Sequence, residues 1–133
     1  MKPKTLARLL LPSVILVLSL SACTDPNEEF IQGRWVFANE HNIERSGPAH
    51  VLYEWVFSGG TFFTQTTVAE PQTLYGNYRI IKSEEGLLRI EIYNLNGTRA
   101  YAYTDQKGEL DIQIDTENDQ IRIQGELFYR EKP

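Results

Sequence analysis

This chain has very few cysteines and histidines. Among its 133 residues it has one cysteine, Cys23, and two histidines, His41 and His50. A single cysteine cannot form an intramolecular disulfide, and it excludes the cysteine-rich ligand sets typical of structural zinc sites. Both histidines lie in or beside the segment Asn39 to Ala49, near two glutamates, and this spacing is too weak a signal to predict a metal site. We therefore predict no metal and no cofactor.

The chain also lacks a convincing set of catalytic residues. Ser46 and His50 are one possible nucleophile and base, but serine catalysis also needs an orienting group and an oxyanion hole, and no motif supplies them. The run Asp115 to Asp119 alternates oxygen ligands, yet it lacks the glycine and the final glutamate of a calcium loop, so it predicts an acidic turn. The sequon Asn96-Gly97-Thr98 is interpreted as a turn as well. These patterns favour a protein that is not an enzyme.

No apolar run is long enough to predict a membrane-spanning helix. The run Leu9 to Leu20 falls short of the roughly 20 residues that cross a bilayer. Lys2, Lys4 and Arg8 precede it, and small residues follow it up to Cys23. A basic start, a short apolar segment and a small-residue end are typical of a signal peptide for export. We assign residues 1–22 to this signal.

The end of the signal, Leu20-Ser21-Ala22-Cys23, resembles the lipobox of bacterial lipoproteins. The resemblance implies cleavage after Ala22 and attachment of acyl chains such as palmitate to Cys23. More than one chain gives lasting membrane attachment. The residue after Cys23 is Thr24 and not aspartate. By resemblance to other lipoproteins, this implies that the protein is anchored in the outer membrane and faces the periplasm if the host has two membranes. Otherwise it is anchored on the outer face of the cytoplasmic membrane. An ordinary secretory peptide is the alternative.

Positive charge is scarce beyond the signal. Residues 1–22 hold three basic residues and no acidic one, so the remaining 111 residues carry 10 basic and 18 acidic residues, a formal net charge of −8. This balance argues against nucleic acid as a partner, because nucleic-acid binding depends on basic side chains. Anionic lipid headgroups should repel the domain too. The charge fits either a basic protein partner or simple solubility.

No segment after the signal shows helical periodicity. We interpret Cys23 and the polar residues up to Glu29 as the lipidated cysteine and a short tether, and residues 30–133 as one domain. Short runs rich in β-branched and aromatic residues, separated by glycine, asparagine and aspartate, predict strands. Eight strands with short links predict an all-β, antiparallel up-and-down barrel, with a two-sheet sandwich as the alternative. The predicted strands are Ile31 to Ala38, His50 to Phe57, Thr61 to Val68, Leu74 to Lys82, Leu87 to Tyr93, Thr98 to Thr104, Glu109 to Asp115 and Gln120 to Arg130.

Alternating apolar and polar residues indicate which side chains point into the barrel. An eight-stranded barrel is just wide enough for side chains to fill it or to hold one small ligand. The large number of predicted interior side chains favours a filled interior. They are Trp35, Phe37, Val51, Tyr53, Trp55, Phe57, Tyr78, Ile80, Leu88, Ile90, Ile92, Leu110, Ile112, Ile114, Ile121, Ile123, Leu127 and Tyr129.

The first predicted strand contains Gly33-x-Trp35, which resembles the motif that opens the barrels of lipocalins and the wider calycin group. Thr104-Asp105-Gln106 matches two of the three residues of the family's second signature, between the predicted sixth and seventh strands. The resemblance also implies a basic residue packed over the tryptophan, and Arg130 stands at a similar place. Strict alternation along a single last strand points Arg130 outward instead. The chain is shorter than typical lipocalins, and the resemblance implies a small lipocalin-like barrel.

Tyrosines are abundant, and two of them alternate with alanines. Ala100, Tyr101, Ala102 and Tyr103 put bulky and small side chains on opposite faces of the predicted sixth strand. If the small face points inward, Tyr101 and Tyr103 form an exposed aromatic pair suited to a partner. Ordinary core tyrosines are the favoured interpretation. The candidate ligand or partner residues are Tyr53, Trp55, Tyr78, Tyr101 and Tyr103.

The sequence thus predicts a membrane-anchored, non-enzymatic lipoprotein of the cell envelope. Its lipocalin-like domain would bind a small apolar ligand or an envelope protein. One alternative is an inhibitor of an envelope-attacking enzyme of the lysozyme type, since small acidic anchored barrels with this role are similar in size and charge. Another is an accessory subunit of a membrane complex. The sequence does not choose among them.

Overall fold

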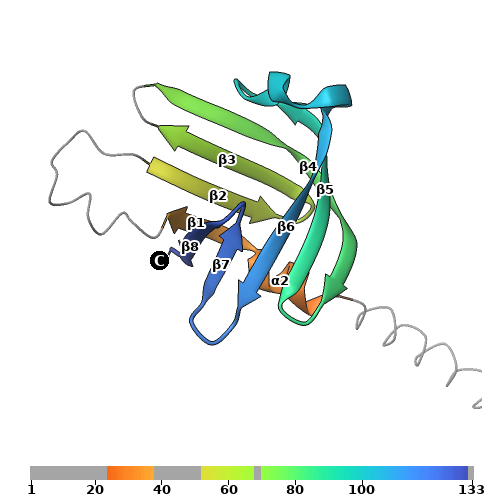
Figure 1. Cartoon of the computed structure of the whole chain (residues 1–133), viewed down its shortest axis with the longest axis vertical. Helices are drawn as coiled ribbons and strands as arrows, with labels where there is room; N and C mark the ends of the chain where they lie inside the picture. The colour runs from red at the N-terminus through yellow and green to blue at the C-terminus, as the bar shows by residue number, and fades with distance from the viewer. Residues whose placement is uncertain (1–23, 38–51, 68–69, 132–133) are drawn as a thin grey trace, which may run out of the picture.

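Eight antiparallel strands form a closed barrel in the computed structural model, which describes residues 24–37, 52–67 and 70–131 (Figure 1). Each strand pairs with the next in sequence, and β8 pairs back to β1 to close the barrel. This confirms the predicted up-and-down barrel and excludes the two-sheet sandwich. The strands are β1 (Gly33–Phe37), β2 (Leu52–Ser58), β3 (Thr61–Thr67), β4 (Pro71–Glu84), β5 (Leu87–Asn96), β6 (Lys107–Asp115), β7 (Gln120–Ile123) and β8 (Glu126–Arg130).

Two of the predicted strands are wrong, and the errors cancel in the count. The segment predicted as a strand from Thr98 to Thr104 instead contains the 3₁₀ helix η2 (Ala100–Ala102) and the start of η3 (Thr104–Gln106). The strand predicted from Gln120 to Arg130 is divided into β7 and β8 by a turn at Gln124 and Gly125, whose φ angles are 52° and 81°. Glutamine rarely takes a positive φ, so the single glycine at position 125 is a weak turn signal in the sequence.

The division of the last strand reverses which side chains face inward. Leu127 and Tyr129 were predicted inside the barrel, but the turn shifts the alternation by one residue. Phe128 pairs with Ile121 and is fully buried, whereas Leu127 and Tyr129 are only partly buried. Arg130 lies two residues after Phe128 and therefore shares its inward face.

The barrel interior is filled by apolar side chains from every strand and from the segment before β1. Four predicted interior residues, Phe37, Tyr53, Ile80 and Ile114, are partly buried against this core, and Val51 lies outside the described residues. The fully packed core also includes residues that alternation did not identify, among them Phe62 and Leu74. Its members are Ile31, Trp35, Trp55, Phe57, Phe62, Leu74, Tyr78, Leu88, Ile90, Ile92, Leu95, Leu110, Ile112, Ile121, Ile123 and Phe128.

The short helix α2 (Pro26–Ile31) begins inside the segment up to Glu29 that was interpreted as a polar tether, and it ends at Ile31, which was wrongly predicted to begin the first strand. Asp25 is its N-cap: one carboxylate oxygen accepts hydrogen bonds from the backbone N–H groups of Asn27 at 2.9 Å and Glu28 at 3.1 Å. An aspartate cap followed by proline is a strong helix start, but six residues are too few to show helical periodicity. Ile31 at its end is completely buried in the core.

The two ends of the barrel are built differently (Figure 1). The closed end consists of α2 and the turns that join β2 to β3, β4 to β5 and β6 to β7. The loop end consists of η2, η3 and the adjoining ends of β4, β5 and β6. In Figure 1, α2 lies near the β4–β5 turn, and the 3₁₀ helices lie at the opposite end of the long strands.

Candidate functional site

Arg130 stacks on two aromatic rings at the closed end. Its guanidinium carbon lies 4.3 Å from the centre of the Trp35 ring and 5.0 Å from the centre of the Phe30 ring. The same guanidinium donates hydrogen bonds to the backbone carbonyls of Gln32 at 2.7 Å and Phe30 at 2.6 Å. It also pairs with the Asp119 carboxylate at 2.8 Å. The expected packing of Arg130 over the tryptophan is confirmed, and the outward orientation that strict alternation gave is wrong.

Gly33 and Trp35 complete this arrangement. Gly33 has a φ of +114°, which strains any residue with a side chain, and a Cβ atom there would lie in ordinary contact, 3.4 Å, with the Arg130 guanidinium. The Trp35 indole N–H donates to the backbone carbonyl of Ile31 at 2.8 Å. Trp35 on β1 and Arg130 on β8 therefore both bind the end of α2, so the predicted motif has a structural role.

Gln32 joins α2 to two further elements. Its side-chain amide donates to the Tyr78 hydroxyl at 2.9 Å, and its amide oxygen accepts from the backbone N–H of Gly59 at 2.8 Å. Burial raises the pKa of Tyr78, which keeps its hydroxyl protonated and able to hydrogen-bond at neutral pH. Tyr78, a predicted ligand or partner residue, is thus buried, and its hydroxyl bonds to Gln32 at the closed end.

The other aromatic residues predicted to bind a ligand or partner do not form one surface. Trp55 is buried, and Tyr53 packs edge-on against Phe128 with ring centres 4.9 Å apart. Tyr103 lies over Gly108, where an added Cβ would come within 2.9 Å of its ring. Tyr101 instead has 87% of its surface exposed. Neither interpretation holds for both residues: Tyr103 packs against the core as favoured, and Tyr101 alone is exposed, because 3₁₀ geometry replaces strand alternation there.

Thr104 and Asp105, the second predicted signature, lie in η3 between β5 and β6. They were predicted between the sixth and seventh strands, and the shift follows from the missing strand at Thr98 to Thr104. Asp105 has a φ of +57°, a conformation that aspartate tolerates better than most residues. Both side chains are exposed, and their placement fits a turn.

A row of apolar side chains on the outer wall of β2, β3 and β4 was not predicted. Val56 pairs directly with Phe63, and Phe63 pairs directly with Tyr75. Each alternates with buried neighbours, so all three face outward. Val56 and Phe63 are partly exposed, and Tyr75 is 46% exposed. We call Val56, Phe63 and Tyr75 the outer row; only the strand register reveals it.

The Tyr75 end of the outer row adjoins the segment that leads into η2. The backbone N–H of Arg99 donates to the carbonyl of Thr73 at 2.9 Å, which joins the segment before η2 to the end of β4. Tyr75 lies two residues beyond Thr73, and Tyr101 lies two residues beyond Arg99. The two most exposed aromatic side chains in the described part of the chain thus come from adjoining segments of the loop end.

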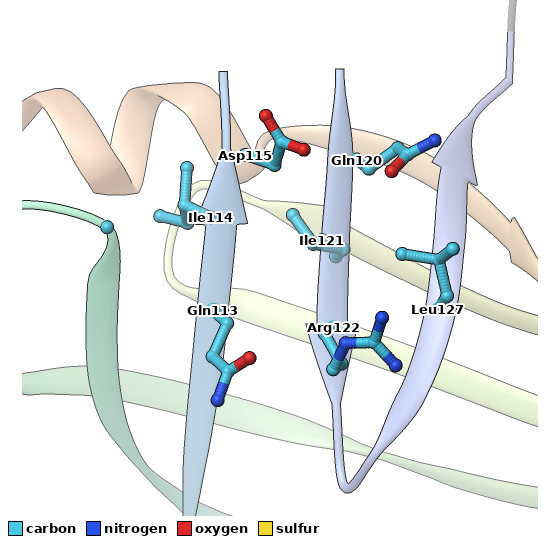
Figure 2. Close-up of a pocket in the computed structure, with 8 residues that line it drawn as sticks. Gln113, Ile114, Asp115, Gln120, Ile121, Arg122 and Leu127 are labelled. Carbon is cyan, nitrogen blue, oxygen red and sulfur yellow. The ribbon is translucent and has the colours of Figure 1, made fainter. Parts of the chain in front are cut away.

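A shallow groove of about 360 Å³ lies where β6, β7 and β8 run side by side (Figure 2). Asp115 and Gln120 lie at one end of the groove, and Arg122 lies nearer the β7–β8 turn. Hydrogen bonds from the Asn118 side chain and backbone lower the pKa of Asp115, so its carboxylate is charged at neutral pH. The remaining lining residues are Gly86, Gln113, Ile114, Ile121 and Leu127. None of the lining residues is a histidine, cysteine or serine, and Asp115 is the one carboxylate among them.

Within the described ranges, no group of three or more histidine, cysteine, aspartate or glutamate side chains is placed to hold a metal ion. Ser46, His41, His50 and the neighbouring glutamates lie outside those ranges, as does Cys23. The described helices include none that is both long enough and apolar enough to cross a bilayer.

Comparisons with protein-family models, with curated proteins and with solved structures found no match for this chain.

Proposed function

We propose that this protein is a lipid-anchored lipoprotein of the cell envelope whose barrel binds another envelope protein through the outer row and Tyr101. The fold supports the coarser part of this proposal, a small β-barrel of the shape used by lipocalin-like binding domains. The observation that carries the finer part is the exposure of aromatic side chains on ordered backbone at one end of the barrel.

Protein interfaces are enriched in tyrosine, and tyrosine is one of the residue types that contribute most to binding energy. Tyr101 exposes 87% of its surface on a 3₁₀ turn. The turn is held by the backbone hydrogen bonds from Ala102 to Arg99 and from Tyr103 to Ala100, each 3.2 Å long. Because the backbone is already ordered, a partner that covers Tyr101 loses little conformational entropy on binding.

A protein is the best-fitting occupant on grounds of charge and shape. The formal charge of −8 beyond the signal disfavours nucleic acid and anionic lipid. The outer row is a line of apolar side chains on a convex wall, and a convex wall does not enclose a small ligand as concave sites do. An enzyme inhibited by this protein and a complex of which it is a subunit are both partners of this kind.

Photocrosslinking in the native envelope tests the partner proposal. A photoreactive phenylalanine analogue at Tyr75 should give one dominant adduct with an envelope protein. The same analogue at Leu127, on β8 at the opposite side of the barrel, should not give it. Tyr101→Ala should then lower the Tyr75 adduct by about tenfold, the effect expected for a modest hot spot.

The outcomes separate the alternatives. Adducts formed equally at Tyr75 and Leu127, or adducts only with lipid, would contradict a specific protein site. A homodimer adduct would make the partner a second copy of this chain. An adduct at Leu127 alone would assign binding to the groove on β6, β7 and β8 instead.

The anchor has its own test. Mass spectrometry of the protein extracted from membranes should show the chain beginning at Cys23 with acyl chains attached. Cys23→Ser should release the protein to the soluble fraction, since no other modification is proposed to hold it. An unmodified thiol at Cys23 in membrane material would overturn the anchor.

One observation favours a second candidate, the binding of a small ligand. Trp55 is 2% exposed, and within the described part of the chain its indole N–H has no hydrogen-bond partner. A buried donor without a partner costs about 1–3 kcal/mol, and an acceptor atom of an apolar ligand would remove that cost. Native mass spectrometry of the membrane-extracted protein should then detect a bound molecule that is lost in Trp55→Phe. A spectrum without bound ligand would leave partner binding as the only proposed function.

A further inference from the structure

We propose that the closed end of the barrel faces the membrane and that the loop end, with Tyr101, points away from it. This orientation rests on the proposed lipid anchor at Cys23 and extends it. It follows from how α2 is attached to the barrel.

The start of α2 is joined to the β4–β5 hairpin. The Ser83 hydroxyl donates to the Asp25 carboxylate at 3.0 Å. The Asn27 side-chain amide donates to the Ser83 hydroxyl at 2.9 Å, to the Glu84 carbonyl at 2.8 Å and to the Leu87 carbonyl at 3.3 Å. Beyond Asn77, β4 no longer pairs with β3, and these contacts join its far end to α2.

The end of α2 is joined to the opposite side of the barrel. Arg130 on β8 holds the carbonyls of Phe30 and Gln32, and the Gln32 side chain holds the β2–β3 turn and Tyr78. Ile31 is completely buried. With both of its ends attached and an anchored side chain between them, α2 cannot swing away from the closed end without losing these contacts.

The lipid would therefore be attached almost directly to a rigid part of the fold. Only Thr24 separates Cys23 from the helix cap at Asp25, and two peptide units span at most about 7.6 Å. So short a link prevents the barrel from turning its loop end to the bilayer. The exposed side chains of Glu29, Glu84 and Glu85 at the closed end favour a hydrated surface contact over insertion into anionic lipid.

Two threonines flank β6 and form a matched pair of probes. Thr104 lies at the loop end and Thr116 at the closed end, and both are exposed. β6 has nine residues, so its ends lie roughly 27 Å apart at about 3.4 Å per residue. With the usual tilt of barrel strands, about 20 Å of this separation lies along the barrel axis.

The experiment uses the lipidated full-length protein in vesicles of neutral and anionic lipid that carry a spin-labelled headgroup. Cys23 is the only native cysteine, and its sulfur is blocked by the lipid, so Thr116→Cys and Thr104→Cys each offer one thiol for a dye. We expect about threefold stronger quenching for Thr116→Cys than for Thr104→Cys, given the ~20 Å difference in height. A flexible insert of about 12 residues between Thr24 and Asp25 spans roughly 19 Å and should remove most of the difference.

Equal quenching at the two positions, or stronger quenching for Thr104→Cys, would overturn the orientation while leaving the anchor intact. A mass spectrum of the same sample without acyl chains, together with no quenching at either position, would overturn the anchor and the orientation with it. A difference that persists after the flexible insertion would show that a surface other than the short link orients the barrel.

Discussion

The closed end and the loop end use the same kinds of residues for different purposes. At the closed end, the aromatic residues Trp35 and Tyr78 are buried, and their polar atoms bond to α2. At the loop end, Tyr101 is 87% exposed. An aromatic side chain whose polar atom bonds within the fold contributes to stability, whereas one presented to solvent on ordered backbone is available to a partner.

This comparison predicts that stability and binding are separable by position. Substitutions at the closed end should destabilise the barrel, and substitutions at the loop end should leave it intact while weakening partner binding.

The largest expected effect is that of Arg130→Met. The substitution removes two charge-assisted hydrogen bonds to backbone carbonyls and the stacking on Trp35 and Phe30, and it should lower the free energy of unfolding by roughly 3 kcal/mol. Urea denaturation of the soluble domain from Thr24 onward measures it. Arg122→Met is the matched control: Arg122 is exposed on β7, and its change should stay within about 0.5 kcal/mol. Equal losses in both variants would refute a special role for Arg130.

Gly33→Ala should have the next largest effect, a loss of about 2 kcal/mol in unfolding free energy. The φ of +114° lies well outside the left-handed region that alanine can reach, whereas the new Cβ would only touch the Arg130 guanidinium at 3.4 Å. Gly59→Ala provides the comparison, because its φ is +51° and no atom lies within 4 Å of the added Cβ. That variant should lose only about 1 kcal/mol, the usual cost of the left-handed conformation. If Gly33→Ala were the milder of the two, the φ of Gly33 would not be the source of strain that it is argued to be.

The cap of α2 should give a smaller effect that depends on pH. Asp25→Ala should cost about 1 kcal/mol at pH 7. Burial opposes the charged carboxylate, but hydrogen bonds from Ser83, Glu28 and Asn27 outweigh it and hold the pKa of Asp25 below its usual value. Its charged form therefore contributes stability above about pH 3.9, and this contribution is lost as pH falls through the lower folded-state pKa.

Asp25→Asn separates the cap from its charge. Asparagine caps helices about as well as aspartate but does not titrate. The stability advantage of the native protein over Asp25→Asn should shrink between pH 6 and pH 3 in urea titrations. A constant difference across this range would contradict the lowered pKa.

The barrel itself was predictable because its signals are local. Alternation in Leu88, Ile90 and Ile92 identified an interior face, and glycine-containing turns such as Ser58 to Gly60 marked the hairpins. All three isoleucine and leucine side chains are completely buried. The part of the fold that was wrong depends on contacts distant in sequence. The alternation of alanine and tyrosine around Tyr101 resembles a strand, but the bond from Arg99 to Thr73 and the packing of Tyr103 on Gly108 accompany a 3₁₀ segment instead.

The candidate site was only partly predictable for the same reason. Gly33, Trp35 and Arg130 were identified from a motif, and their mutual packing is as expected. The outer row was missed because Val56, Phe63 and Tyr75 become neighbours only through the register of three strands. The attachment of α2 was missed because a six-residue helix is recognisable only by its cap and its contacts.

The smallest expected effect on stability is that of Tyr101→Ala. Because the ring is 87% exposed, its removal should change the free energy of unfolding by no more than about 0.5 kcal/mol and the melting temperature by about 3 °C or less. The same variant should weaken the crosslink formed at Tyr75 by about tenfold. Tyr103→Ala provides the contrast, since that ring packs over Gly108 against the core and its loss should cost more than 1 kcal/mol. If Tyr101→Ala proved as destabilising as Tyr103→Ala, the Tyr101 ring would contribute to folding, and the loop end would not be the separable binding surface that the comparison predicts.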